Sequence, residues 1–157
     1  MSQVLEKQKM LNRKEVTDLI LRAKKLKGLT YQQIGEEIGR DKTWVAAAIL
    51  GQASMSEDEA TKLVNLLDLD SDIAFVLQQF PLKGSLDTAI PVDPLIYRFY
   101  EIIQVYGTTL KEVIQEMFGE GIMSAIDFRM DIQKKEDPNG DRVIVTFDGK
   151  FLPYKKW

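Results

Sequence analysis

Residues 94–128 read PLIYRFYEIIQVYGTTLKEVIQEMFGEGIMSAIDF, and the fold class depends on a change of pattern inside this stretch. Asp93 and Pro94 predict a helix start, with an aspartate cap and a proline whose missing N–H costs nothing in the first turn. We predict that this helix runs to about Val105 and is broken at residues 106–108. A second helix should begin at Thr109 and end near Gly119.

The residues after Ser124 change to a period of two, which is typical of a β-strand with one apolar face. The alternating apolar residues are Ile126, Phe128, Met130 and Ile132. Residues 137–140, Asp-Pro-Asn-Gly, predict a turn, and residues 142–147 the returning strand. A two-stranded hairpin alone is marginally stable in water, so we expect a second subunit to cover its apolar face.

The chain before this region has a helical pattern from Arg13 to about Phe80, and we predict about five short helices there. Capping-box spacings (Thr30 with Gln33, Ser56 with Glu59) predict helix starts, and three glycines (Gly28, Gly39, Gly51) predict helix ends. Three prolines and a glycine then interrupt the periodicity in residues 81–94. The sequence therefore predicts an α+β chain: a helical domain at 1–80, a linker at 81–93 and a helix-plus-hairpin domain at 94–157.

The composition is that of a globular protein of 157 residues, with 45% hydrophobic and 29% charged residues. Residues 1–9 lack the pattern of a signal or transit peptide, and no apolar stretch approaches the ~20 residues of a membrane span. We therefore expect a cytoplasmic protein with no membrane partner. With 21 basic and 24 acidic residues spread along the chain, no polycationic half suggests nucleic acid as the main partner.

The chain has no histidine and no cysteine, which excludes imidazole proton transfer, thiolate nucleophiles and the usual soft metal ligands. The remaining candidates for chemistry are Arg98, Glu101 and Ser124, a permanent cation, a carboxylate and a hydroxyl. Together these groups suit a small anion. Taken alone, Arg98 and Glu101 have the spacing of an ordinary solvent-exposed ion pair on a helix. A lone serine such as Ser124, after a glycine-containing segment, is more often a cap or turn residue.

Several blocks in matching order resemble the cyanase (cyanate hydratase) family. They are residues 91–94, 97–101, 104–111, 119–126 and 148–153, with a looser match through the helical half that includes residues 48–52. The family's catalytic arginine, glutamate and serine match Arg98, Glu101 and Ser124. Some members have a histidine and a cysteine where this chain has Gln115 and Ser85, but neither belongs to the catalytic three.

The resemblance implies decomposition of cyanate to ammonia and carbon dioxide through carbamate. Bicarbonate would be a co-substrate, and no cofactor or metal is expected. It implies charge stabilisation by Arg98, hydrogen bonding by Ser124, and orientation of Arg98 by Glu101, with proton transfer as a second role of the carboxylate. It also implies intertwined dimers that form a homodecamer with active sites between subunits.

A helix-turn-helix DNA-binding regulator is the alternative, because residues 30–51 resemble the phage-repressor motif. The second helix of this motif is mostly apolar, from Trp44 to Leu50, whereas a recognition helix presents polar side chains to base edges. We therefore interpret the helical half as an assembly module that resembles a repressor in shape only. An inactive scaffold with the same fold is a third hypothesis.

Overall fold

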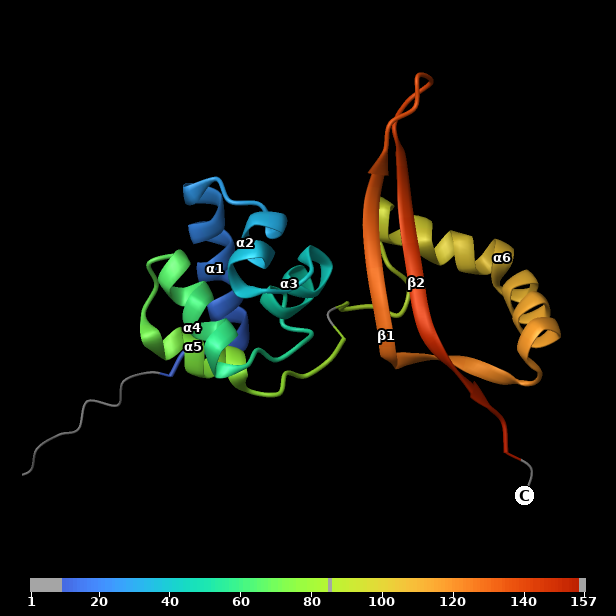
Figure 1. Ribbon diagram of the computed structural model, residues 1–157, viewed down its shortest axis with the longest axis horizontal. Helices are drawn as coiled ribbons and strands as arrows, with labels where there is room; N and C mark the ends of the chain where they lie inside the picture. Colours follow the sequence, from blue (N-terminus) through green and yellow to red (C-terminus); the bar gives the residue numbers. More distant parts are fainter. Residues whose placement is uncertain (1–9, 85, 156–157) are drawn as a thin grey trace, which may run out of the picture. The chain divides into compact units, whose positions relative to one another are not determined.

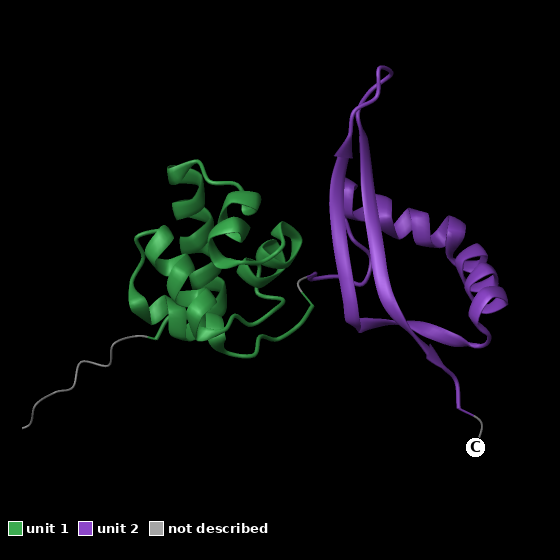
Figure 2. Cartoon of the chain, viewed as in Figure 1, with its two compact units in different colours: residues 1–85 green, residues 86–157 purple. Residues whose placement is uncertain are grey.

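The computed structural model describes residues 10–84 and 86–155 of the chain. The chain divides into two compact units, residues 1–85 (unit 1) and residues 86–157 (unit 2), shown in Figures 1 and 2. Unit 1 is helical and unit 2 combines one long helix with an antiparallel hairpin, so the predicted α+β class is confirmed. In the part that the structure describes, no helix has both the length and the apolarity to cross a bilayer.

Unit 1 contains five helices within residues 10–84, as the sequence predicts. They are α1 (Arg13–Lys27), α2 (Tyr31–Ile38), α3 (Lys42–Ile49), α4 (Glu57–Leu66) and α5 (Ser71–Gln78). The predicted capping boxes of Thr30 and Ser56 are both formed. Gly28 and Gly39 end α1 and α2 with φ of 64° and 80°, a left-handed conformation that glycine adopts without strain. Short-range signals thus fix these helix ends.

The core of unit 1 is aliphatic and draws on all five helices. Its largest fully buried side chains are Ile20, Ile34, Ile49, Leu63, Leu77, Val16 and Val45. Each helix contributes its apolar stripe to one contiguous cluster, so burial of apolar area dominates the stability of this unit.

Arg13 reaches into unit 1 from the first turn of α1 without any carboxylate partner among the described residues. Its Nη1 donates to the carbonyl of Val76 at 2.8 Å, and its Nη2 donates to those of Ala48 at 2.9 Å and Ala53 at 2.8 Å. Ala48 and Val76 lie in the last turns of α3 and α5, where the helix dipole favours a cation. The guanidinium therefore ties three parts of the unit together.

Unit 2 begins with α6 (Pro94–Phe118), a single helix of 25 residues. The predicted break at residues 106–108 is wrong, because Gly107 lies inside the helix. A glycine in a helix interior costs about 1 kcal/mol relative to alanine and does not itself interrupt the backbone hydrogen bonds. The predicted start is confirmed, since Asp93 accepts hydrogen bonds from the amides of Leu95 and Ile96 at 2.9 and 3.0 Å.

The hairpin consists of β1 (Gly121–Lys135) and β2 (Arg142–Pro153), paired antiparallel across the predicted turn. Both strands extend beyond the predicted ranges at the end nearer α6. The pairing is regular from Phe128 with Gly149 to Lys135 with Arg142, and it resumes at Met123 with Phe151. Between these points four residues of β1, 124–127, stand opposite Lys150 alone, which makes a large irregular bulge.

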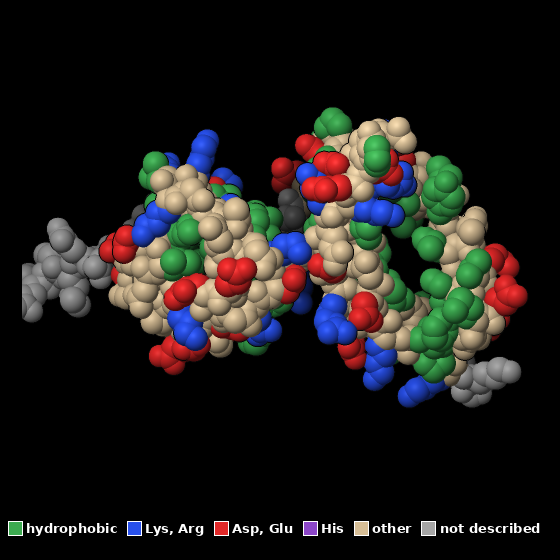
Figure 3. Space-filling model, turned by 45° about the horizontal axis from the view of Figure 1, so that its top comes forward, with side chains coloured by type: hydrophobic (Ala, Val, Ile, Leu, Met, Phe, Trp, Pro, Cys, Tyr) green, Lys and Arg blue, Asp and Glu red, His purple; other side chains and the backbone are tan. Residues whose placement is uncertain are grey.

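The apolar surface of unit 2 is largely uncovered in the isolated chain. None of the residues of α6, all of which the structure describes, is buried, although the helix has a strong apolar face. Figure 3 shows hydrophobic side chains gathered around a hollow in this unit. Monomeric proteins rarely expose apolar surface on this scale. The single chain therefore leaves most of this unit without a core.

Candidate active site

Arg98 and Glu101 lie near the N-terminal end of α6, three residues apart. Arg98 Nε lies 3.5 Å from a carboxylate oxygen of Glu101, and the two side chains are 70% and 39% exposed. The Asp93 cap and Pro94 fix the start of the helix and therefore the direction in which both side chains leave it. The two terminal nitrogens of Arg98 form a fork that can hold two anionic oxygens at once. They make no hydrogen bond within the described residues, so this fork is free.

An exposed ion pair of this kind contributes little to stability, about 0–1 kcal/mol. Its interest is chemical rather than structural. Glu101 contacts Arg98 through Nε and leaves the outer edge of the guanidinium available. A planar cation with this edge available can meet an oxyanion with two parallel hydrogen bonds.

Ser124 lies in the bulge of β1 and is only 7% exposed. Its Oγ accepts hydrogen bonds from the backbone N–H groups of Ile126 at 3.1 Å and Asp127 at 2.9 Å. A serine hydroxyl has two acceptor lone pairs and one hydrogen. Because two amides already occupy the acceptor side, the hydroxyl hydrogen is left to donate to an acceptor outside the bulge.

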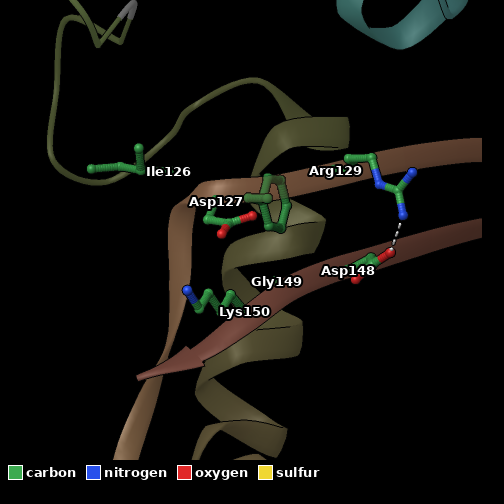
Figure 4. A pocket seen from close by; sticks show the side chains of 7 residues that line it. Ile126, Asp127, Arg129, Asp148, Gly149 and Lys150 are labelled. Atoms are coloured by element: carbon green, nitrogen blue, oxygen red, sulfur yellow. Dashed lines mark hydrogen bonds and ion pairs between the residues drawn. The ribbon is translucent and has the colours of Figure 1, made fainter. Parts of the chain in front are cut away.

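The bulge borders an open hollow of about 520 Å³ between the two strands (Figure 4). Its lining residues are Ile126, Asp127, Phe128, Arg129, Asp148, Gly149 and Lys150. Arg129 donates to Asp148 at 3.0 Å across the strands. Figure 4 shows that β1 bends at Asp127, with Ile126 pointing outward, and Ile126 is 92% exposed. Charged residues of both strands thus line the hollow that the bulge borders.

The isolated chain does not join the three candidate residues. Within the described residues, no hydrogen bond or ion pair links Ser124 to Arg98 or Glu101, and each group has only local partners. The two hydrogen bonds that Ser124 Oγ accepts were not predicted, because they depend on the register shift at the bulge, which no sequence pattern shows. Gly149, which lines the hollow, belonged to a predicted block but had no assigned role.

Comparisons with known proteins cover both units. A family model described as cyanate hydratase, N-terminal, matches residues 13–81, and one described as the cyanate lyase C-terminal domain matches residues 88–156.

Among curated relatives, a cyanate hydratase from Synechococcus sp. (strain CC9311) is 60% identical over 90% of this chain and 95% of its own length. One from Dechloromonas aromatica (strain RCB) is 55% identical over 94% of this chain and 100% of its own length.

Among solved structures, the crystal structure of cyanase from T. urticae superposes with a TM-score of 0.80 at 42% identity, covering 88% of this chain and 96% of that chain. The two family models, placed in order on the two units, together with relatives matched over nearly their whole length, show that this chain belongs to the cyanate hydratase (cyanase) family.

Proposed function

We propose that the chain catalyses the bicarbonate-dependent decomposition of cyanate to ammonia and carbon dioxide. The observation that carries this proposal is the match, over 90% of the chain, to relatives named cyanate hydratase. The site supports it, because a free arginine fork and a hydroxyl with only its hydrogen available both favour binding of anions. Bicarbonate enters as co-substrate, and no cofactor takes part.

The reaction begins when a bicarbonate oxygen attacks the cyanate carbon and the C–N π electrons move to nitrogen, giving a dianionic adduct. The nitrogen takes up one proton from solution and the proton of the former bicarbonate hydroxyl, the bond between the bicarbonate carbon and the bridging oxygen breaks, and carbon dioxide leaves with carbamate as the product. Carbamate takes up a second proton from solution at nitrogen and separates into ammonia and a second carbon dioxide. Two protons are thus consumed for each cyanate.

Bringing two anions together is the electrostatic problem of this reaction. At ~4 Å, two like charges repel by about 1 kcal/mol in water and by about 4 kcal/mol at an effective dielectric constant near 20. Arg98 offsets this repulsion with a permanent charge. It interacts more strongly with the dianionic adduct than with either reactant, which is the condition for a faster reaction.

Ser124 donates its hydroxyl hydrogen to an oxygen of the bound anion in this proposal. Its two amide donors hold Oγ in place and withdraw electron density from it, which favours donation over attack as a nucleophile. Glu101 holds the Arg98 guanidinium through Nε, and proton delivery to nitrogen is its second proposed role.

Assembly completes the site in this proposal. The uncovered apolar face of α6 and the hairpin supports intertwining with a second chain, and dimers would join into a homodecamer with active sites between subunits. A decamer of 17.9 kDa chains has a mass of roughly 180 kDa, so sedimentation at micromolar concentration as a monomer or isolated dimer would contradict this arrangement.

Unit 1 acts as an assembly module in this proposal, in a cytoplasmic enzyme without a nucleic-acid partner. The short turn between α2 and α3 supports the resemblance in shape to a repressor. On α3, however, Val45, Ala48 and Ile49 are buried, and Trp44 lies under the Arg40 guanidinium, 4.3 Å from ring centroid to Cζ. Little of that helix remains to present polar side chains to base edges.

The test is ammonia release from cyanate in carbon-dioxide-free buffer, with and without added bicarbonate. We expect turnover to collapse without bicarbonate and to recover when it is added. Arg98→Leu should lose turnover by about 10²–10³-fold while sedimenting as the wild type does. Arg142→Leu, the same change at an exposed position beside the hairpin turn, is the matched control and should stay within about twofold. Normal turnover in Arg98→Leu would remove Arg98 from the mechanism.

A further inference from the structure

Gly149 lies against the bulge that carries Ser124, at a distance that no other residue could keep. A Cβ built on Gly149 would lie 2.5 Å from the carbonyl oxygen of Ser124, 2.5 Å from Cγ of Met123 and 3.1 Å from its Sδ. The φ of Gly149 lies outside the left-handed region, so the backbone angles themselves would accept alanine. Space, and not backbone conformation, therefore requires glycine here.

The contact with Ser124 is the informative one, because it involves backbone. The Met123 side chain can rotate away from an added methyl group, whereas the Ser124 carbonyl moves only with the chain of the bulge. That same turn of chain carries the Ser124 hydroxyl, which its bonds to the amides of Ile126 and Asp127 fix relative to the backbone. A shift of the carbonyl is thus transmitted to Oγ.

We propose that Gly149 is a positioning residue of the active site, which sets the place of the Ser124 hydroxyl by letting β2 lie directly against the bulge. The proposal rests on the proposed role of Ser124 in binding the anionic substrate. It assigns to Gly149 no contact with substrate.

The size of the effect follows from the distances. Ordinary contact begins at 3.4 Å, so the 2.5 Å separation must open by about 0.9 Å in Gly149→Ala. Active-site groups act within about 0.5 Å of their productive positions, and a misplacement of about 1 Å can cost on the order of 10²-fold in rate. We expect Gly149→Ala to lower kcat/KM by about 10–100-fold.

The test is a double-mutant cycle between Gly149→Ala and Ser124→Ala in the full-length oligomer. The readouts are kcat and KM for cyanate and, where turnover is too low, the calorimetric affinity for azide, a linear monoanion of the size of cyanate. A residue that acts through Ser124 has no further effect once the hydroxyl is gone. We expect Gly149→Ala to weaken azide binding by about tenfold with Ser124 present and by less than about twofold in the Ser124→Ala background.

Equal losses in the two backgrounds would overturn the proposal and leave Gly149 with a packing role alone. If Ser124→Ala itself keeps wild-type turnover and azide affinity, the proposed role of Ser124 fails, and the role of Gly149 fails with it. Val145→Ala, a truncation of a half-buried side chain in the regular part of β2, controls for loosening of the hairpin. It should lower thermal stability without changing azide affinity.

A second variant covers the case in which Gly149→Ala does not assemble. Met123→Ala combined with Gly149→Ala removes the side-chain clash and keeps the clash with the Ser124 carbonyl. We expect this double variant to regain assembly and to remain about 10–100-fold impaired in turnover. Recovery of wild-type turnover would show that only Met123 packing requires the glycine, and would overturn the proposal.

Discussion

Replacing Arg13 by methionine should destabilise unit 1 out of proportion to its place in the first turn of α1. The guanidinium donates three hydrogen bonds to backbone carbonyls, those of Ala48, Ala53 and Val76. Hydrogen bonds from a charged donor contribute about 1.5–3 kcal/mol each at best, but these acceptors can partly rehydrate, which reduces the value to about 1 kcal/mol each. Methionine keeps most of the apolar stem and so isolates the loss of the head group.

Two further terms act on this sum in opposite directions. Burial lowers the pKa of Arg13, which means that holding the charge there has a desolvation cost that methionine avoids. Loss of a cation from the last turns of α3 and α5 removes a favourable interaction with both helix dipoles. We expect a net loss of about 2–3 kcal/mol in the free energy of unfolding.

The assay is urea unfolding of the full chain followed by Trp44 fluorescence, in a Trp157→Phe background because the chain has two tryptophans. Arg22→Met is the matched control: it makes the same change on the same helix, at an exposed arginine without a hydrogen bond or ion pair to the described residues. That variant should stay within about 0.5 kcal/mol of the parent. Equal stability of the two variants would refute the reasoning on Arg13.

The other predictions concern α6, an acid-sensitive cap and the charge at the site. Gly107→Ala should raise the stability of α6 by about 0.5–1 kcal/mol, because alanine favours a helix interior over glycine. Within the chain the new methyl group would meet only a methyl of Ile103, at 3.7 Å, which is ordinary contact. Faster amide hydrogen exchange across α6 in this variant would contradict a continuous helix. For Glu59, burial raises the pKa, but hydrogen bonds from Ser56 and Arg40 outweigh it and hold the pKa below its usual value. The resulting stabilisation is present above the unfolded-state pKa of about 4.3 and is lost as pH falls through the lower folded pKa. Glu59→Gln should therefore flatten the fall in unfolding free energy below a pH of about 4.5. An unchanged pH profile of stability would contradict this role of Glu59. Arg98→Lys keeps the charge but loses the fork, and should lower kcat/KM by at least about tenfold, whereas wild-type kinetics would show that a point charge suffices.

Local signals in the sequence predicted the helical unit well, because they act within a few residues. The capping boxes at Thr30 and Ser56 and the left-handed glycines at positions 28 and 39 need no tertiary information. The same kind of local reasoning gave a wrong prediction at Gly107, where it placed a helix break. A glycine weakens a helix by an amount that the long apolar face of α6 can offset, and the sequence does not show that offset directly.

The bulge could not be predicted from pattern, since it depends on which residues of β2 face β1. Ile126 continued the alternation of Phe128 and Met130 in the sequence, yet it is 92% exposed because the register slips between Met123 and Phe128. The hydrogen bonds to Ser124 and the crowding at Gly149 follow from that slip. Ser124 as a candidate came from the family blocks, and its role remains a prediction.

Mixed oligomers test most directly the proposal that assembly completes the site, in the form that Arg98 of one chain meets Ser124 of another. Arg98→Leu and Ser124→Ala, each with little activity alone, would be unfolded together, reassembled and assayed for ammonia release. In a two-fold pair with sites shared between chains, each mixed dimer holds one intact site, so we predict recovery of up to about a quarter of wild-type activity. No recovery in mixed oligomers of native mass would contradict a site built from two chains.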